Sequence, residues 1–390
     1  MCENDSLIAY YCDSLYRNES SELMENCYLE QCFIPKRVPY ALSVPLTTVY
    51  TFIFGFGLAG NFLTSIAILF SKDLLATTTA KYLLNLAIAD MITLISGIPF
   101  ESGKRDDRGN GMVGETGWSG KRDGRGKGTQ SKEGAAACAL ETTYYVSALT
   151  ILAFAFERYL AICHVLFIRK IVFYQQHLDK LLISCWILAI LSSIPYAINH
   201  KTDYLVDKWL PYPDYGPLKS TKVCMLPLMN NDMETYQKLK LLFHGSAFVY
   251  FLLPFFVISV LYWRIQKNSR SRMMDGHSRR WVQRLNSNKD AKPHKKGIQI
   301  LNFLVSVVAV FFTCYAPFQA QRLIFFYIDD PQLLPKINEY LYIISGILFY
   351  LSGVLNPFLY NLISPKYRHA LQDIFRSKSS SIKLNYETAL

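Results

Sequence analysis

Three polar side chains, each inside a long apolar stretch of the chain, are of the types that bind a small cation. They are Asp90, Ser147 and Asn356. An ionisable group in an apolar membrane segment is costly, so it is normally paired or functional. A carboxylate beside a hydroxyl and an amide supplies oxygen ligands for a hard cation. The same groups would also form a hydrogen-bonded cluster that packs helices together, and the residues alone leave both interpretations open.

Further charged side chains lie in stretches of the same kind. Glu141, Glu157 and Arg158 share one apolar run with Ser147, and Arg322 lies in another. Ser147 and Arg158 are eleven residues apart, which is about three helical turns plus 20°. A helix over this run would therefore carry both groups on one face.

Seven apolar stretches must position these groups. Of the 390 residues, 51% are hydrophobic and only 18% are charged, whereas a soluble domain has about 25% charged residues. A helix of about 20 apolar residues crosses a bilayer, and the stretches of that length are residues 45–70, 82–100, 135–163, 181–198, 241–263, 298–327 and 337–363. The sequence therefore predicts an all-α membrane protein, a bundle of seven transmembrane helices.

Basic residues in the connections predict the orientation of the bundle. Residues 1–43 contain seven acidic and three basic side chains, whereas residues 264–297 contain eleven Lys and Arg against two Asp. We expect residues 1–43 outside the cell, residues 44–364 in the bundle, and residues 365–390 as a cytoplasmic amphipathic helix and tail. The formal charge of +11 then reflects the inner membrane face, and no nucleic-acid partner is expected.

Short motifs along the chain resemble those of one family. They are GLAGN with Asn61, LNLAIAD with Asp90, ERY at 157–159 followed by LAIC, Trp186, Pro254 with Tyr262, FFTCYAPF around Pro317, and NPFLY at 356–360. In this order and spacing the chain resembles a rhodopsin-type (class A) G-protein-coupled receptor. The resemblance implies a receptor of the plasma membrane, with a heterotrimeric G protein as partner, rather than an enzyme.

Two other classes of membrane protein fit the sequence less well. A secondary transporter would show paired halves and broken helices at mid-membrane, and the chain has no internal repeat. A membrane hydrolase would need a metal-type cluster, and the seven His do not form a set with ligand spacing in the helices.

The family resemblance implies roles for individual residues. Glu157 would hold Arg158 in the inactive state, and the residues implied in activation and G-protein coupling are Glu157, Arg158, Tyr159, Tyr262, Tyr315, Pro317, Asn356, Pro357 and Tyr360. A sodium ion would bind at Asp90, Ser147, Ser352 and Asn356, and no other cofactor is implied. Tyr315 departs from the family pattern, which usually has Trp at this position.

A narrower resemblance concerns the ligand. FERYLAICH, SGIPFE and CYAPFQAQRL resemble the neuromedin U and pyrokinin receptors, with ghrelin-like or neurotensin-like receptors as the alternative. The resemblance implies a peptide agonist with an amidated, arginine-containing C-terminus, coupling through Gq, and ligand contacts at Glu101, Glu141, Phe318, Gln319 and Arg322. The residues alone favour the other interpretation, in which Glu101 is a solvated helix-end charge and Glu141 forms an internal ion pair with Arg322.

Residues 102–134 interrupt the resemblance. They contain ten of the twenty glycines, eight Lys or Arg and five acidic residues, and this composition predicts no packed element. The family pattern implies a disulfide from the start of the third helix to Cys224, but its usual position, 25 residues before Arg158, is Glu133, and Cys138 is the nearest alternative. The run is either a disordered loop of this lineage or translated non-coding sequence that carries no function. A non-signalling receptor, disrupted at residues 102–134, is the alternative to a signalling one.

Features near the two ends of the chain suggest modifications and a further partner. Asn4 and Asn18 begin glycosylation sequons on the expected outer side. Thr388 and Leu390 form an ending that fits strand addition to a PDZ-type domain.

Overall fold

A computed structural model describes residues 40–103, 128–163, 176–199, 201–204, 222–225, 233–274, 291–328, 333–363 and 367–373. For several short stretches, including residues 99–103 and 128–134, the description is limited to the backbone. The glycosylation sequons at Asn4 and Asn18, the terminal Thr388 and Leu390, and residues 104–127 lie outside the described residues.

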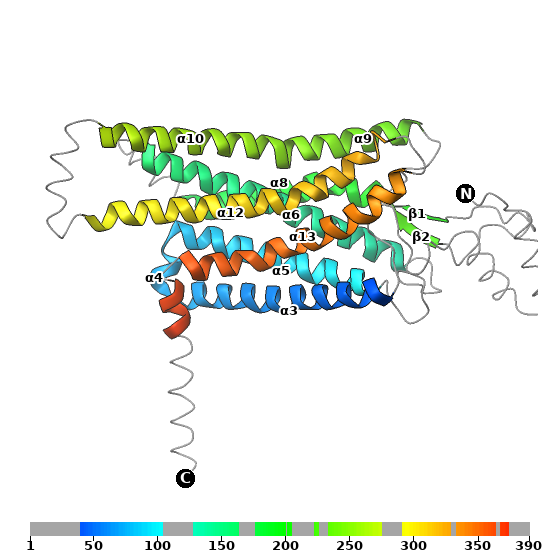
Figure 1. The fold of residues 1–390 in the computed structure, drawn as a ribbon, viewed down its shortest axis with the longest axis horizontal. Helices are drawn as coiled ribbons and strands as arrows, with labels where there is room; N and C mark the ends of the chain where they lie inside the picture. The colour runs from blue at the N-terminus through cyan, green and yellow to red at the C-terminus, as the bar shows by residue number, and fades with distance from the viewer. Residues whose placement is uncertain are drawn as a thin grey trace, which may run out of the picture.

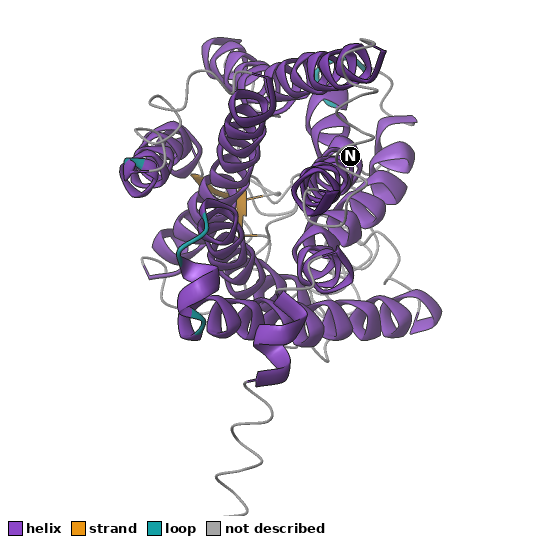
Figure 2. Ribbon diagram, turned by 90° about the vertical axis from the view of Figure 1, so that its left-hand side faces the viewer, coloured by secondary structure: helices purple, strands orange, loops and turns teal. Residues whose placement is uncertain are grey.

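Within the described residues, seven long helices run side by side and form the bundle (Figures 1 and 2). They are α3 (Tyr40–Phe70), α5 (Thr78–Gly103), α6 (Gly128–Cys163), α8 (Leu178–Asn199), the continuous helix of α9 (Met233–Ala247), η5 (Phe248–Leu252) and α10 (Leu253–Met274), then α12 (Ala291–Ile324) and α13 (Leu333–Ile363). Each contains an apolar segment of 20 residues or more that is long enough to cross a membrane. The predicted fold class, a bundle of seven membrane helices, is confirmed.

A pair of short strands and a short helix mark opposite ends of the bundle (Figure 1). Strands β1 (Lys201–Tyr204) and β2 (Lys222–Met225) pair antiparallel at one end, a hairpin that no sequence pattern predicted. The short helix α4 (Lys72–Leu75) lies at the other end, where Ser71 caps it by accepting a hydrogen bond from the Leu74 backbone N–H. We call these the β-hairpin end and the α4 end.

A wide helical turn precedes Pro254. The N–H of Leu253 donates to the carbonyl of Phe248, five residues earlier, which makes η5 a π-helical turn. Proline has no N–H and its ring clashes with the carbonyl four residues before it. That carbonyl belongs to Tyr250, and it accepts a hydrogen bond from the Tyr144 hydroxyl of α6 at 3.2 Å. The proline thus frees a carbonyl that joins the fifth helix of the bundle to the third.

Small residues let α3, α5 and α13 approach closely near the middle of the bundle. A Cβ added to Gly353 would lie 3.3 Å from the Cβ of Asp90. The carbonyl of Gly353 accepts a hydrogen bond from Asn61 Nδ2 at 2.8 Å, and the same amide group donates to Gly57 at 2.9 Å. These contacts hold Asp90 against α13.

The helices extend beyond the apolar stretches that predicted them. The helix α6 already begins at Gly128, inside the run of residues 102–134 for which no packed element is predicted, and for residues 128–134 only the backbone is described. Likewise, α12 begins at Ala291 rather than near 298. Helical hydrogen bonds are made within the backbone, so a helix continues past the apolar surface that anchors it.

A short helix at 367–373 follows α13 and turns across the bundle (Figure 1). Tyr367 is buried, its hydroxyl lies 2.8 Å from Thr64 Oγ1 of α3, and its ring packs edge-on against Tyr360. The expected helix after the seventh span is therefore present and is attached to the α4 end.

Candidate functional site

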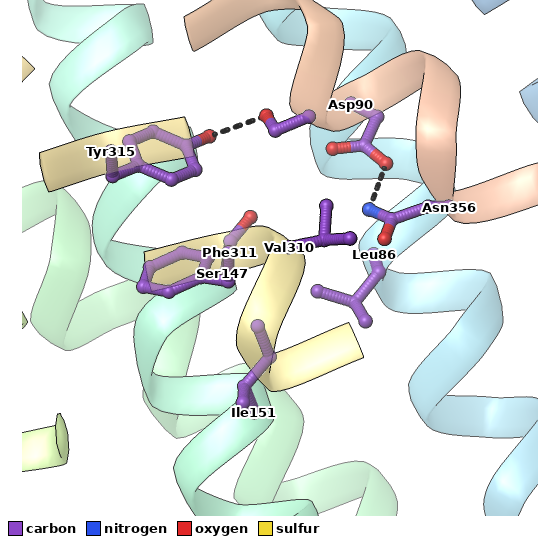
Figure 3. Close-up of a pocket in the computed structure, with 9 residues that line it drawn as sticks. Leu86, Asp90, Ser147, Ile151, Val310, Phe311, Tyr315 and Asn356 are labelled. Carbon is purple, nitrogen blue, oxygen red and sulfur yellow. Dashed lines mark hydrogen bonds between the residues drawn. The ribbon is translucent and has the colours of Figure 1, made fainter. Parts of the chain in front are cut away.

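A small cavity of about 10 Å³ lies at the middle of the bundle. Its lining includes all four side chains predicted to bind a cation: Asp90, Ser147, Ser352 and Asn356. Figure 3 shows Asp90 and Asn356 joined by the hydrogen bond that Asn356 Nδ2 donates to Asp90 Oδ2 at 2.9 Å. The structure thus brings together groups that lie up to 266 residues apart in the sequence.

The hydroxyl protons of Ser147 and Ser352 have backbone carbonyl acceptors that do not line the cavity. Ser147 donates its single hydroxyl proton to the Thr143 carbonyl at 2.9 Å. Ser352 lies 2.7 Å from the Phe349 carbonyl, which can only accept. The oxygens left to face the cavity therefore act as acceptors, and a buried carboxylate among them is costly without a partner. This donor set fits a small cation of the sodium type.

A buried ion pair between α6 and α12 lies nearer the β-hairpin end. Arg322 Nη2 lies 2.8 Å from Glu141 Oε1, and Arg322 Nη1 donates to Glu141 Oε2 at 3.1 Å. The pair is bidentate, and the two side chains are only 11% and 10% exposed. Such a fork is the strongest form of carboxylate–guanidinium contact. The internal ion pair, one of the two predicted interpretations, is therefore present.

Three aromatic rings surround the guanidinium of Arg322. The Cζ atom lies 4.5 Å from the ring centroid of Phe243, 4.8 Å from Tyr196 and 4.9 Å from Phe318. The cation–π attraction of these rings partly replaces the water that Arg322 has lost. We call Arg322 with these rings the arginine cage.

The other three predicted ligand contacts are placed as follows. Phe318 forms part of the arginine cage and packs against Phe349. Gln319 is buried, and its Nε2 has no hydrogen-bond partner among the described residues. Glu101 lies in the last turn of α5, in a stretch where only the backbone is described.

At the α4 end, Glu157 and Arg158 form a second ion pair. Arg158 Nη2 lies 2.8 Å from Glu157 Oε1 and donates to Thr78 Oγ1 at 3.0 Å. Thr78 in turn donates to Glu157 Oε1 at 2.8 Å. Glu157 is 1% exposed. The three groups close a triangle between α5 and α6, which we call the Arg158 triangle.

The other predicted activation residues are placed as follows. Tyr262 of α10 has a buried hydroxyl with no partner among the described residues. Tyr360 is fully buried and Tyr159 partly buried. Pro317 and Pro357 lie inside α12 and α13, and Tyr315 lines the cavity.

The implied disulfide at Cys138 is not formed. Cys138 is a free thiol, and its Sγ lies 3.3 Å from Ser193 Oγ of α8. The reason is helical geometry, because a position five residues after Glu133 is rotated by about 140° around the helix. Cys138 therefore faces α8. The side chain of Cys224, in β2, lies outside the part of the chain that the structure describes.

Sequence reasoning missed three features of these sites. They are Thr78 in the Arg158 triangle, Tyr196 and Phe243 in the arginine cage, and the hydroxyl of Tyr315 beside the cavity. Each depends on which faces of two different helices meet, and hydrophobic periodicity along one helix does not carry this information. Only Tyr315 gave a signal, because it replaces the Trp of the family pattern.

Comparison with known proteins supplies further context. The family model described as 7 transmembrane receptor (rhodopsin family) matches residues 135–360. The pyrokinin-1 receptor of Drosophila melanogaster is 29% identical, in an alignment that covers 90% of this chain and 84% of the relative. The neuromedin-U receptor 1 of Mus musculus is 30% identical over 83% of this chain and 71% of the relative. The neuromedin-U receptor 2 of Homo sapiens is 27% identical, with 88% and 74% covered.

Proposed function

Because the chain belongs to the rhodopsin family of seven-transmembrane receptors, we propose that it is a receptor for a peptide with an amidated, arginine-containing C-terminus. The coarser function follows from the family and from the neuromedin U and pyrokinin receptors that the chain is similar to. It is a multi-pass receptor of the plasma membrane and not an enzyme. It responds to a neuropeptide and signals through a G protein.

The observation that carries the ligand proposal is the buried carboxylate of Glu141. It is held by a bidentate arginine contact and stands beside the rings of the arginine cage. A second arginine, supplied by a peptide, has the same forked donors and would fit the same carboxylate. Glu101, in the last turn of α5, would add a second acidic partner. An amidated peptide end carries no charge for these acids to repel.

Arg322 has two states in this proposal. Without ligand it is paired with Glu141, as the structure describes it. When the peptide arginine binds Glu141, the guanidinium of Arg322 is released to a peptide carbonyl while it keeps its aromatic contacts. Because Arg322 lies on α12 and Glu141 on α6, this exchange would loosen one bond between the two helices at the β-hairpin end.

A panel of peptides tests the ligand class. Cells that express the full chain should respond to arginine-amide peptides with a rise in intracellular calcium, and a Gq inhibitor should block the response. Replacing the peptide arginine by lysine should weaken the response strongly, because lysine is a single point donor rather than a fork. Equal potency of the lysine peptide would contradict the proposal.

Sodium should weaken agonist binding through the Asp90 cavity. We propose that sodium bound at Asp90, Ser147, Ser352 and Asn356 stabilises the inactive state, so that agonist affinity falls as sodium rises. Asp90→Asn should remove this dependence, because it removes the one formal negative charge of the cavity. The measurement is agonist competition binding at several sodium concentrations, with choline holding ionic strength constant. Affinity of the unmutated receptor that is flat with sodium would refute the site.

The long connection between α5 and α6 should limit how much receptor reaches the cell surface. Replacing residues 102–140 by a shorter loop with Cys 25 residues before Arg158 should raise the surface fraction. A restored disulfide to Cys224 would stabilise the β-hairpin end, and a native disulfide contributes about 2–5 kcal/mol. Surface labelling relative to total receptor gives the result, and the same loop with Ser in place of Cys is the control. If the native chain reaches the surface and signals as well as the replacement, residues 102–134 do not disrupt the receptor.

A further inference from the structure

The hydroxyl of Tyr315 lies at the edge of the Asp90 cavity. Tyr315 is 3% exposed and lines the cavity together with Asp90 and Ser147. Its hydroxyl lies 3.3 Å from Ser352 Oγ. In Figure 3 this hydroxyl faces the space between α12 and the Asp90–Asn356 pair. The side chain thus adds a fifth oxygen to the four already described.

The hydrogen bonds around Tyr315 leave its oxygen with acceptor capacity. The proton of Ser352 is shared with the Phe349 carbonyl, which at 2.7 Å is much the closer of its two partners. A phenol oxygen has two lone pairs, and the long contact to Ser352 occupies one of them weakly. The other aromatic side chain of the lining, Phe311, offers no oxygen at all.

Ring contacts fix the position of this oxygen. The ring of Tyr315 packs against Phe311 at 4.6 Å, Tyr144 at 4.8 Å and Phe349 at 5.1 Å between centroids. A side chain held on three sides by packing is preorganised, so little conformational entropy is lost when its oxygen binds a ligand. A change that removes the oxygen and keeps the ring would leave these contacts in place.

We propose that the phenolic oxygen of Tyr315 is a direct ligand of the sodium ion held by Asp90. The inference rests on the sodium site of the proposed function and deepens it, because it assigns the site a ligand from α12. Sodium is a hard cation that prefers oxygen ligands, and a neutral phenol oxygen supplies one without adding charge. The bound ion would then connect α5, α6, α12 and α13, whereas without Tyr315 it would have no ligand on α12.

The experiment uses the full chain, purified in lipid nanodiscs without agonist. The thermal unfolding midpoint is measured as sodium replaces choline at constant ionic strength, and again as potassium replaces choline. Sodium should raise the midpoint of the unmutated receptor, because a ligand that binds the folded state stabilises it. Tyr315→Phe should shift the sodium concentration of half-maximal effect about tenfold higher, as expected for the loss of one polar contact to a charge.

Two further variants separate this inference from the sodium site itself. Asp90→Asn should abolish the sodium effect. Tyr350→Phe removes the hydroxyl of another buried tyrosine, one that packs against Phe349 but does not line the cavity, and it should leave the sodium dependence unchanged. If Asp90→Asn abolishes the effect and Tyr315→Phe responds to sodium like the unmutated receptor, the Tyr315 ligand is refuted while the site stands. If sodium and potassium act alike, or Asp90→Asn keeps the effect, the cavity holds water only and both proposals fail.

Discussion

Glu141→Gln is expected to lower the potency of an arginine-amide peptide by a factor of roughly 30 to several thousand. The removal of one partner from a buried, hydrogen-bonded charge pair costs about 2–5 kcal/mol, and each 1.4 kcal/mol is about tenfold in affinity. Glu141 is such a partner, because its side chain is only 10% exposed and makes both contacts of a bidentate ion pair with Arg322. Glutamine keeps the size of the side chain but offers one acceptor and no charge. Agonist dose–response at matched surface density measures the change.

Arg322→Gln separates ligand binding from simple loss of the ion pair. If Glu141 serves the peptide, Arg322→Gln leaves that carboxylate free for the ligand's arginine, and potency should fall far less than in Glu141→Gln. If the pair only stabilises the bundle, the two variants should lose surface expression and potency to the same extent. That second result, or full potency of Glu141→Gln at normal surface density, would remove the main chemical support for an arginine-ended ligand.

Lysine peptides provide a check that does not depend on mutants folding well. In the unmutated receptor a lysine peptide should be much weaker than its arginine counterpart, and in Glu141→Gln the two should become nearly equal. Shortening the peptide at its N-terminus should change little in either receptor. A double-mutant cycle between the receptor and peptide changes isolates the pairwise contact from indirect effects of either change alone.

The sequence predicted the helices of this receptor better than the partners of its polar groups. Seven apolar runs gave seven spans, because the length of apolar chain needed to cross a bilayer is a local property. Contacts between helices depend on the rotation of each helix about its axis. The π-helical turn before Pro254 changes that rotation within the fifth helix, and Cys138 faces Ser193 rather than β2. Neither feature is visible in periodicity.

The contacts of the polar sites were likewise only partly predictable from the sequence. Asp90, Ser147 and Asn356 could be grouped from their types, and the structure brings them to one cavity. Glu141 and Arg322 could also be named, but the arginine cage takes Tyr196 from α8 and Phe243 from α9. No sequence feature distinguishes a buried aromatic residue that only packs in the core from one that also contacts a cation. Thr78 is similar, because one Thr among three in a row gives no sign that it bonds Glu157.

Glu157→Gln is expected to raise signalling without agonist by about three- to tenfold. In the Arg158 triangle the Glu157 carboxylate receives hydrogen bonds from Arg158 and from Thr78, and it is 1% exposed. A hydrogen bond to a charged group contributes about 1.5–3 kcal/mol. If about half of that is lost when Arg158 turns toward the G protein, removing the charge shifts the equilibrium about three- to tenfold toward the active state. Basal calcium signalling at matched surface density gives the measurement.

Thr78→Val should have a smaller effect in the same direction as Glu157→Gln. Valine keeps the shape of threonine but removes the hydroxyl that donates to Glu157 and accepts from Arg158, while the ion pair itself remains at 2.8 Å. The basal signal should therefore rise, but less than in Glu157→Gln. Thr79→Val is the matched control, because Thr79 belongs to the same turn of α5 and takes no part in the triangle.

The direction in which basal signalling changes shows whether Glu157 restrains the inactive state or contacts the G protein. If the Arg158 triangle restrains the inactive state, Glu157→Gln must signal more without agonist and still respond to it, because Arg158 itself is untouched. If Glu157 instead contacts the G protein, the same variant must lose both basal and agonist-driven signalling at normal surface density. Arg158→Gln should lose signalling in either case. Only the Glu157 and Thr78 variants therefore distinguish the two roles. A basal signal equal to that of the unmutated receptor in both would mean that the triangle packs α5 against α6 and does not control activation.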